Sequence, residues 1–358
     1  MREQLSVFIG RFSPFHLGHE EVLLRALKSS EVVLLLIGSS HQARTPKNPF
    51  TYEERQAVVS RWYATQARLA KDYKKGPFGR LEILDLVDYP YNDQEWIAQV
   101  QRKVNTVRQS LEIPNSWPNI LTGAERDAST WYLKAFGSFF KQDFVAETKV
   151  GFDHSATDVR KNYFSNGNAW EYTTPAETIE FLDKWKTTAE YATAVAEFNY
   201  LEAYKKSWAQ APYAPTFVTV DACVVQSGHV LVVRRANFPG KGLLALPGGF
   251  VEQNEKLVDA CVRELQEETS IEMSPAQLYG SIKAKEVFDL PDRSLRGRTI
   301  STCYLFKLRD TFQLPKVKAQ KGEVQNLEWL PLDQALQSPQ LWFEDHYHIL
   351  KTMLGLIR

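Results

Sequence analysis

Residues 10–19 read GRFSPFHLGH, and they join an alternating apolar run at 5–9 to a helical pattern at 19–28. Strand, helix and strand in this order predict a parallel sheet with crossover helices. Open sheets of this kind bind ligands beyond the carboxyl ends of their strands, which is where GRFSPFHLGH lies. Further strand candidates are 32–37, 81–87 and 120–121.

The junction of this strand and helix is a predicted anion site. Free backbone N–H groups and the positive end of the helix dipole both point toward it. Gly18 allows a phosphate to approach the backbone closely, while His16 and His19 can donate hydrogen bonds to oxygens that become more negative as a pyrophosphate leaves. The alternative, a capped helix start with two incidental histidines, requires a His-x-Gly-His match to arise at this position by chance.

These residues resemble the nucleotidyltransferase superfamily built on the His-x-Gly-His motif, whose members transfer a nucleotidyl group from a nucleoside triphosphate to a phosphate acceptor. The resemblance implies a Rossmann-like α/β domain, a parallel sheet with flanking helices. It also implies that His16 and His19 are catalytic, and that Gly10, Phe12 and Gly18 bind the phosphates of ATP.

A second signature of that superfamily is a serine or threonine followed by a basic residue at another helix start, and residues 155–160, SATDVR, supply it. Thr157 can cap the helix and bind phosphate, and Arg160 can hold the β- or γ-phosphate of ATP. Alone, such a cap is more often structural. Paired with His-x-Gly-His, it predicts that Arg160 is catalytic.

The loop at 38–55 narrows the choice of acceptor. It reads GSSHQARTPKNPFTYEER and ends in a capping box from Thr51 to Glu54. Its NPFT and ER elements resemble nicotinamide mononucleotide (NMN) adenylyltransferases of the archaeal type more than cytidylyltransferases or pantetheine-phosphate adenylyltransferases. That resemblance implies an NMN site with Asn48, and with Trp96 stacked on the nicotinamide ring. A core or interface tryptophan is an equal alternative for Trp96.

The sequence pattern changes near residue 174. TPAE at 174–177 predicts a capping box with proline at the first helical position, and a helical pattern follows to about Trp208. The prolines of 211–215, APYAP, end that helix, and β-rich runs beyond them predict a second sheet. We expect a nucleotidyltransferase domain at 1–185, a helical tail and linker at 186–214, and a second domain at 215–358.

A second chemical motif lies at 249–271: GFVEQNE, seven residues, then RELQEETSI. Within it, Glu264, Glu267 and Glu268 have i, i+3 and i+4 spacing, which gathers their carboxylates on one side of a helix within reach of hard cations. They lie near the helix C-terminus, where negative charge is disfavoured. A metal would offset that penalty, whereas the alternative is an acidic, solvated helix end.

This motif resembles the Nudix box at every position but one, Ser270, where the box usually has glycine. The resemblance implies a Nudix α/β/α sandwich and metal-dependent cleavage of a diphosphate, with Mg²⁺, or Mn²⁺ in its place, as cofactor. It also implies that Arg263 orients the glutamates. If position 270 takes a positive φ, serine adds strain but removes no ligand. The implied metal ligands are Gly248, Glu264, Glu267 and Glu268, with Glu267 also catalytic and Glu323 a candidate distal catalytic base.

Residues 289–298, DLPDRSLRGR, indicate the substrate of this domain because they resemble segments of Nudix hydrolases that act on ADP-ribose. Arg293, Arg296 and Arg298 would bind ADP-ribose, although an ordinary solvated loop explains them equally well. The segment 343–348, FEDHYH, recurs in related tails. We expect its two histidines to stabilise a helix rather than to catalyse.

The composition of the chain limits the number of domains, the kinds of partner and the location that we expect. A chain of 358 residues, 44% apolar and 24% charged, suits two globular domains. Its 43 basic and 43 acidic residues cancel, so no global field draws it to nucleic acid or to an anionic membrane. No apolar run approaches the roughly 20 residues of a membrane span, and no signal-peptide core precedes the first strand. Cys223, Cys261 and Cys303 lack metal or redox spacing, which predicts buried thiols in a reducing cytoplasm.

Together the two motifs resemble a known fusion of NMN adenylyltransferase with Nudix hydrolase. The resemblance implies that the chain makes NAD and pyrophosphate from NMN and ATP, and separately hydrolyses ADP-ribose to AMP and ribose 5-phosphate. Its expected partners are these small molecules, with no nucleic acid and no membrane, and a homo-oligomer is left open. Two alternatives stay open for its function: a different phosphate acceptor, or a second domain that senses a nucleotide without cleaving it.

Overall fold

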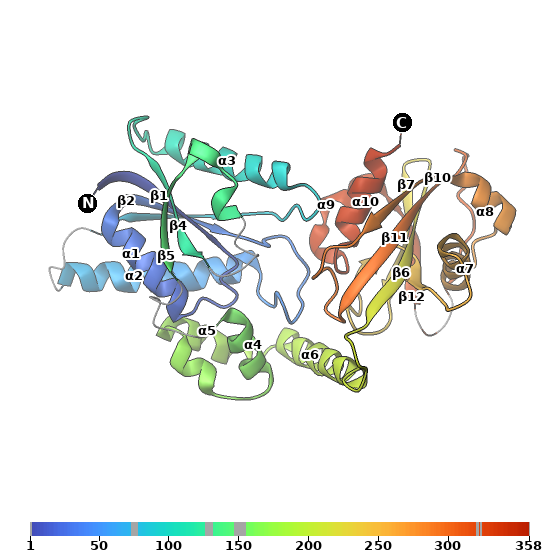
Figure 1. Ribbon diagram of the computed structural model, residues 1–358, viewed down its shortest axis with the longest axis horizontal. Helices are drawn as coiled ribbons and strands as arrows, with labels where there is room; N and C mark the ends of the chain where they lie inside the picture. Colours follow the sequence, from blue (N-terminus) through green and yellow to red (C-terminus); the bar gives the residue numbers. More distant parts are fainter. Residues whose placement is uncertain are drawn as a thin grey trace. The chain divides into compact units, whose positions relative to one another are not determined.

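A computed structural model describes residues 2–72, 78–125, 132–146, 155–319, 322 and 324–357 (Figure 1). The chain divides into two compact units, Met1–Val195 and Ala196–Arg358, and each unit is described by itself. The division falls within helix α6 (Ala189–Ser207). Among the described residues, no helix has both the length and the apolar character that crossing a bilayer requires.

The first unit is built on a five-stranded parallel sheet in the order β3-β2-β1-β4-β5, which confirms the expected Rossmann-like arrangement. The direction of strand succession reverses beside β1, where such sheets form their ligand crevice. The strands are β1 (Arg2–Gly10), β2 (Ser30–Ile37), β3 (Arg80–Asp85), β4 (Asn119–Glu125) and β5 (Lys141–Ala146); the helices include α1 (Leu17–Ser29), α2 (Tyr52–Asp72), α3 (Asp93–Ser110), α4 (Ala156–Phe164) and α5 (Ala176–Trp185).

Both faces of this sheet are covered by helices. Leu34 and Leu36 of β2 belong to an apolar cluster with α3, whereas Val33 and Leu35 belong to one with α1 and α2. Adjacent residues of a strand point to opposite faces, so a run that is apolar throughout is buried on both. Each of these leucines is fully buried and contributes about 1.5–3 kcal/mol to folding.

The helix start expected at 174–177 differs in two respects, the position of the proline and the cap. Pro175 is the N-cap of α5 and provides no side-chain cap, while the Thr174 hydroxyl donates to the carbonyl oxygen of Trp170 at 2.9 Å. The predicted capping box is therefore wrong, because the preceding turn already uses the threonine hydroxyl. The helical pattern that follows is split at 186–188 into α5 and α6, and α6 ends at Ser207, close to the expected end at Trp208.

The second unit contains a mixed seven-stranded sheet in which β6 pairs in parallel with β11, while its hairpin with β7 is antiparallel. Helices α7 and α8 cover one side and α9 and α10 the other, as expected for a Nudix sandwich (Figure 1). The strands are β6 (Thr216–Gln226), β7 (His229–Arg235), β8 (Leu244–Ala245), β9 (Gly248–Phe250), β10 (Ile282–Phe288), β11 (Arg298–Lys307) and β12 (Val324–Pro331); the helices are α7 (Leu257–Thr269), α8 (Pro275–Ser281), α9 (Leu332–Gln337) and α10 (His346–Gly355).

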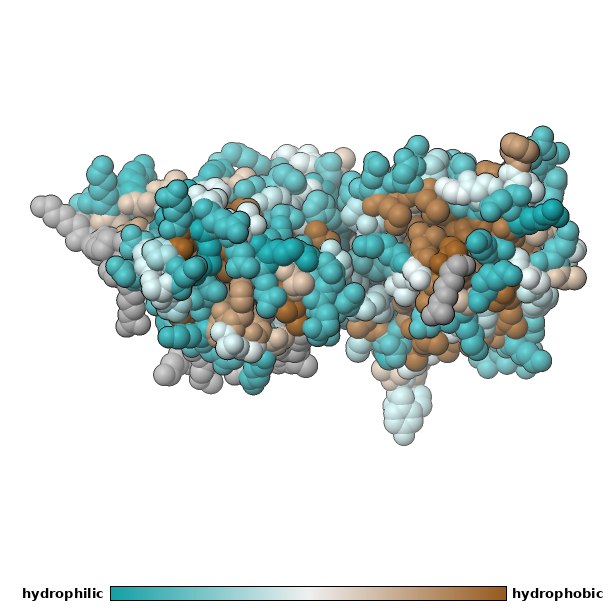
Figure 2. Space-filling view, turned by 90° about the horizontal axis from the view of Figure 1, so that it is seen from above, coloured by the Kyte–Doolittle hydropathy of each residue, from teal (hydrophilic) through white to brown (hydrophobic). Residues whose placement is uncertain are grey.

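The structure meets the condition stated for Ser270 and confirms the predicted buried thiols. Ser270 ends α7 with φ 41° and ψ 38°, the left-handed conformation that usually selects glycine. Cys223, Cys261 and Cys303 are buried and form no disulfide. At the surface, Figure 2 shows hydrophilic residues over most of the face in view, with hydrophobic residues gathered in patches between them.

Candidate active sites

Two histidines start α1. His16 is the N-cap, and its Nδ1 accepts a hydrogen bond from the backbone N–H of Gly18 at 3.2 Å. His19 closes a capping box, because its Nδ1 accepts from the backbone N–H of His16 at 3.4 Å. A ring nitrogen that accepts from a backbone N–H carries no proton, so each neutral ring holds its proton on Nε2. The backbone thereby leaves both Nε2–H groups as donors.

The two imidazoles lie together at the carboxyl edge of the sheet. Their ring centroids are 3.7 Å apart, and the His19 ring meets Phe12 edge-on at 4.9 Å and stacks on Phe15 at 6.0 Å. His16 is buried and His19 half-buried. Buried aromatic neighbours hold the rings in place, which is the preorganisation that stabilisation of a leaving anion requires.

Gly10, Phe12 and Gly18 all lie in this turn, but they can offer backbone rather than side chains. The Phe12 side chain is buried in the apolar core, and its backbone has a φ of 50°. A Cβ on Gly10 would lie 2.8 Å from the Phe12 ring, so the turn closes only around a glycine. Gly18 is buried and its N–H donates to the Nδ1 of the N-cap His16, which fixes the helix start to which a phosphate would come.

The helix cap of the second signature lies two residues before the expected one. Ser155 is the N-cap of α4, and Asp158 completes the capping box, so Thr157 lies exposed in the first turn. The prediction that Thr157 caps this helix is therefore wrong. Ser155 takes that place because the carboxylate of Asp158, three residues after it, accepts a hydrogen bond from the Ser155 backbone N–H at 3.1 Å.

Arg160 is buried between two loops. Its guanidinium donates to the carbonyl oxygens of Ser13 at 2.5 Å and Pro46 at 3.1 Å, and to the Thr157 hydroxyl at 3.2 Å. Burial, and secondarily the nearby Arg11 charge, lower its pKa to about 9, so it remains a cation at neutral pH. Arg160 thus joins the turn that carries His16 and His19 to the loop at 38–55, and it brings a positive charge to both.

Sequence reasoning missed two other arginines. Arg55 donates to the carbonyl oxygens of Arg11 and Gly38, both at 2.7 Å, which ties the ends of β1 and β2 together. Arg11 is exposed, and its charge lowers the pKa values of Arg55 and Arg160. The available signals were the position of Arg11 inside GRFSPFHLGH and that of Arg55 inside the ER element.

The two expected NMN residues lie in different surroundings. Asn48 is 4% exposed, and its Nδ2 donates to the carbonyl oxygen of Ser39 at 3.3 Å. Its Oδ1 is buried without a hydrogen-bond partner among the described residues. Trp96 lies in the first turn of α3, partly buried against an apolar cluster, with its ring edge-on to Tyr132 at 5.6 Å.

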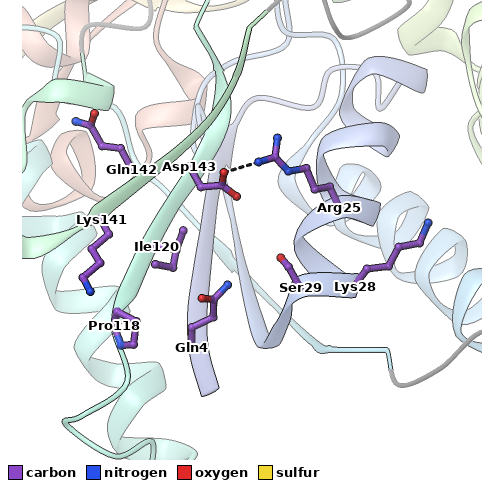
Figure 3. A pocket seen from close by; sticks show the side chains of 9 residues that line it. All are labelled: Gln4, Arg25, Lys28, Ser29, Pro118, Ile120, Lys141, Gln142 and Asp143. Carbon is purple, nitrogen blue, oxygen red and sulfur yellow. Dashed lines mark hydrogen bonds and ion pairs between the residues drawn. The ribbon is translucent and has the colours of Figure 1, made fainter. Parts of the chain in front are cut away.

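A hollow of about 750 Å³ lies at the opposite edge of this sheet, where β1, β4 and β5 begin (Figure 3). Arg25 and Lys28 contribute positive charge, but Asp143 pairs with Arg25 across the opening (Figure 3). The C-terminus of α1, the negative end of its dipole, also lies here. This hollow is therefore separate from the histidine turn and poorly suited to a phosphate.

The second site is organised around Arg263 on α7. Its Nη1 donates to Glu264 Oε1 and to Glu267 Oε2, both at 2.8 Å, and its other nitrogens bind Glu255 at 2.7 and 3.0 Å. The prediction that Arg263 orients the glutamates is confirmed. Because Glu264 and Glu267 both accept from Nη1, the positively charged guanidinium of Arg263 lies between the two carboxylates.

Strand β9 brings the glycines of the motif against the same carboxylates. The N–H of Gly248 donates to Glu268 Oε2 at 3.0 Å. A Cβ on Gly249 would lie 2.6 Å from the carboxyl carbon of Glu264, so only glycine leaves room for that group. Glu264 is 12% exposed at its side chain and Glu267 is 58% exposed, so the set runs from the interior to the surface.

These residues fit a divalent cation by their chemistry. Glu264, Glu267 and Glu268 offer hard anionic oxygens, and Gly249 lets the Glu264 carboxylate pack directly against β9. Among the described residues, no three His, Cys, Asp or Glu side chains are gathered as a ready-made metal site. A metal ion would therefore compete with the Arg263 guanidinium for Glu264 and Glu267.

A small cavity of about 50 Å³ lies beside Gly248 and Glu268 and is lined by arginines and aromatic rings. Arg293 lines it but is bound to Asp345 through two nitrogens, at 2.7 and 2.9 Å. Arg296 also lines it, with its guanidinium over the Phe250 ring at 5.2 Å. Arg298 instead donates to the carbonyl oxygen of Asp289. Glu323, the candidate distal base, lies outside the described residues.

The two units match two different protein families. Residues 7–162 match the cytidylyltransferase-like family model, and residues 215–353 match the NUDIX domain model. A nicotinamide/nicotinic acid mononucleotide adenylyltransferase of Acinetobacter baylyi is 32% identical over 185 residues, 52% of this chain and 88% of that protein. An ADP-ribose pyrophosphatase of Methanocaldococcus jannaschii is 39% identical over 93 residues, 26% of this chain and 52% of that protein.

Solved structures of a Francisella tularensis relative span both units. A bifunctional NMN adenylyltransferase/ADP ribose pyrophosphatase of Francisella tularensis, complexed with AMP and a manganese ion, is 33% identical, with a TM-score of 0.85 and 98% of each chain covered. The chain belongs to this bifunctional NMN adenylyltransferase/ADP ribose pyrophosphatase family. Both domain types expected from the sequence are thus present in the order expected.

In this bifunctional family member, the variant Gly248→Ala tests whether the stability of the second unit depends on close backbone packing between β9 and β6. A Cβ there would lie 2.1 Å from the carbonyl oxygen of Val220, so Gly248→Ala must push β9 away from β6. We expect it to lower the free energy of unfolding by about 1–3 kcal/mol, measured by urea denaturation of the second unit's transition. Gly280→Ala is the matched control.

Gly280 lies in α8 with nothing within 4 Å of an added Cβ. Alanine there should leave the transition unchanged or raise its free energy by up to about 1 kcal/mol, since alanine favours helix over glycine. Equal denaturation midpoints for Gly248→Ala and Gly280→Ala would contradict this prediction, because they would show that β9 can move away from β6 without loss of stability.

The burial of His346 predicts that the second unit loses folding stability as the pH falls. It is buried, its Nδ1 accepts from the N–H of Leu246 at 3.1 Å, and burial lowers its pKa from 6.5 to about 3, with nearby Asp345 opposing and Arg293 reinforcing the shift. The folded state therefore keeps the ring neutral while the unfolded chain protonates below pH 6.5. This contribution to stability is complete above pH 6.5 and declines as the pH falls toward 3.

His346→Gln removes this difference in proton binding. Between pH 6.5 and 5 the wild type should lose about 2 kcal/mol more of its unfolding free energy than His346→Gln, at about 1.4 kcal/mol per pH unit. Denaturant titrations at the two pH values measure it. A loss of the same size in both proteins would mean that the ring protonates inside the folded unit.

Proposed function

We propose that the first unit transfers the adenylyl group of ATP to NMN, giving NAD and pyrophosphate, and that the second hydrolyses ADP-ribose to AMP and ribose 5-phosphate. The observation that carries this proposal is the 98% coverage of both chains by a relative whose name states both activities. The histidine turn and the carboxylate helix support it, because each lies in the unit whose chemistry needs it.

In the first unit, catalysis is mainly alignment and charge stabilisation. The phosphate oxygen of NMN attacks the α-phosphorus of ATP, and the bond from that phosphorus to the pyrophosphate oxygen breaks. The Nε2–H groups of His16 and His19 donate to the departing pyrophosphate, and Arg160 supplies positive charge. No covalent bond to the protein is required. The helix start at Gly18 receives the same negative charge through its dipole.

In the second unit, water attacks one phosphorus of ADP-ribose and the bridging P–O bond breaks. A bound magnesium or manganese ion would neutralise the diphosphate and lower the pKa of a water molecule. Glu264, Glu267 and Glu268, with the carbonyl of Gly248, are the proposed ligands. Arg263 orients Glu264 and Glu267, and Arg296 is the proposed contact for the anionic substrate, because it lines the cavity beside Glu268.

The finer assignments are proposals of the same kind. Asn48 and Trp96 are proposed for NMN, because the buried Oδ1 of Asn48 can accept from an amide and the Trp96 ring lies near the carboxyl edge of the sheet. ATP is the proposed nucleotide donor. The cytoplasm is the proposed location, since the thiols of Cys223, Cys261 and Cys303 are free.

A substrate panel tests the acceptor and the nucleotide. We expect NMN to be adenylylated by ATP with a kcat/KM at least tenfold above that of pantetheine phosphate or of CTP as donor. We expect ADP-ribose to be cleaved, with AMP as a product. Preferential use of pantetheine phosphate would favour the alternative acceptor. Binding of ADP-ribose without AMP release would favour a sensor, although a sensor has no need of the Arg263 carboxylate network.

A further inference from the structure

Glu344 has the most unusual environment of the carboxylates that line the second unit's cavity. It lines that cavity together with Glu268 and Arg296, and its side chain is only 6% exposed. Its backbone has a φ of 45°, the left-handed conformation that non-glycine residues rarely adopt. The neighbouring Phe343 N–H donates to the carbonyl oxygen of Leu244 at 2.8 Å, which fixes this turn against β8. The residue is held in place despite its strain.

The two carboxylate oxygens of Glu344 are unequally satisfied. Oε2 lies 3.9 Å from the Arg296 Nη2. Oε1 is buried and has no hydrogen-bond partner among the described residues. Burial raises the pKa of Glu344, while the Arg296 charge and a hydrogen bond from the Ser294 side chain oppose that rise. Because Oε1 has no partner in the described part of the chain, the contacts with Arg296 and Ser294 are made by Oε2. An acceptor that is buried and unpaired is costly, and such groups persist where a ligand supplies the missing donor.

The chemistry of the cavity restricts what that donor can be. Arg235 and Arg296 are suited to the diphosphate, whereas a carboxylate repels it. Asp221, another carboxylate of the lining, already accepts from the Ser301 hydroxyl. Glu344 must therefore face a part of the ligand that bears O–H or N–H groups rather than phosphate oxygens. In a nucleoside diphosphate sugar those are the ribose hydroxyls and the amino group of the base.

We propose that Glu344 accepts a hydrogen bond from a ribose hydroxyl of the nucleoside diphosphate sugar that binds beside this cavity, with that hydroxyl directed into it, and so determines its specificity. This inference rests on the proposed function of the second unit. A carboxylate is the group with which nucleotide-binding proteins commonly recognise ribose hydroxyls. Adenine has a single exocyclic amino group, whereas each ribose offers hydroxyls that can reach one acceptor.

The test measures binding rather than turnover. Calorimetry with EDTA present compares ADP-ribose with three analogues: one deoxygenated at the adenosine ribose, one deoxygenated at the terminal ribose, and one with hypoxanthine in place of adenine. The proteins are the wild type, Glu344→Leu, which removes the acceptor, and Glu344→Gln, which keeps a neutral one. We expect the wild type to bind one deoxy analogue about ten- to a hundredfold more weakly than ADP-ribose.

In Glu344→Leu that ratio should fall to within about twofold, and Glu344→Gln should restore part of it. A purely structural role would weaken all four ligands alike and leave the ratios unchanged, which would overturn the proposal. Loss of discrimination only against the hypoxanthine analogue would assign Glu344 to the base instead. Because no turnover is needed, a protein that binds ADP-ribose without cleaving it would disprove the hydrolase function and still test Glu344.

Discussion

NAD synthesis should fall by about 10²–10³-fold in His19→Ala while ADP-ribose hydrolysis stays at the wild-type rate. The ring donates from Nε2 to charge that develops only as pyrophosphate leaves, and losing one such donor typically has an effect of this size on kcat. Its backbone-facing Nδ1 accepts a single 3.4 Å hydrogen bond, so stability should change by about 1 kcal/mol or less. Initial rates of both reactions and a denaturant titration measure these effects.

His229→Ala is the matched control for this variant. His229 lies at the start of β7 in the second unit, outside the cavity and the carboxylate helix, and its Nδ1 contacts the Ser227 carbonyl oxygen at 2.8 Å. Both reactions should be retained in it. If His19→Ala instead loses NAD synthesis only in proportion to a loss of folded protein, the histidine would be a cap and not a catalytic donor.

ADP-ribose hydrolysis should fall by at least about a hundredfold in Glu267→Gln, with NAD synthesis unaffected. Residues that only support a metal ligand already cost 10–100-fold when removed, so a ligand itself should cost at least as much. Glu267 is 58% exposed at its side chain, so folding does not depend on its burial. Hydrolysis rates across a range of magnesium concentrations measure the loss, and the half-saturating concentration should rise.

Glu272→Gln is the control for Glu267→Gln. Glu272 is an exposed glutamate just beyond the end of α7, and substituting it removes the same charge without touching the carboxylates. Wild-type hydrolysis with an unchanged magnesium dependence is expected. Retention of activity in Glu267→Gln would assign the metal to other oxygens and leave Glu267 as a partner of Arg263.

Much of the fold could be predicted because its determinants are local. The run at 32–37 is short and apolar throughout, which is typical of a strand buried on both faces. The Thr51–Glu54 capping box is present, with hydrogen bonds of 2.8 and 3.3 Å. The positive φ of Ser270 agrees with the glycine that the Nudix box usually has at this position. In each case neighbouring residues decide the conformation.

The remaining features depend on contacts between distant segments. Local sequence patterns cannot show that Arg55 joins the ends of β1 and β2. Nor can they show that the Thr174 hydroxyl donates its hydrogen bond to the carbonyl oxygen of Trp170. They also place a helix cap only within a residue or two, which is why Ser155 rather than Thr157 caps α4. The segment 343–348 recurs in related tails, but the sequence drew attention to its histidines rather than to Glu344, whose importance appears only when its burial and its unpaired oxygen are known.

Product analysis of the wild-type protein tests the central claim, that one chain carries two separate chemistries. The protein is incubated with magnesium and either NMN plus ATP or ADP-ribose alone, and the products are separated by chromatography. We predict NAD and pyrophosphate in equal amounts from the first mixture, and AMP and ribose 5-phosphate in equal amounts from the second. Absence of NAD, or recovery of intact ADP-ribose, would contradict the account for the corresponding unit.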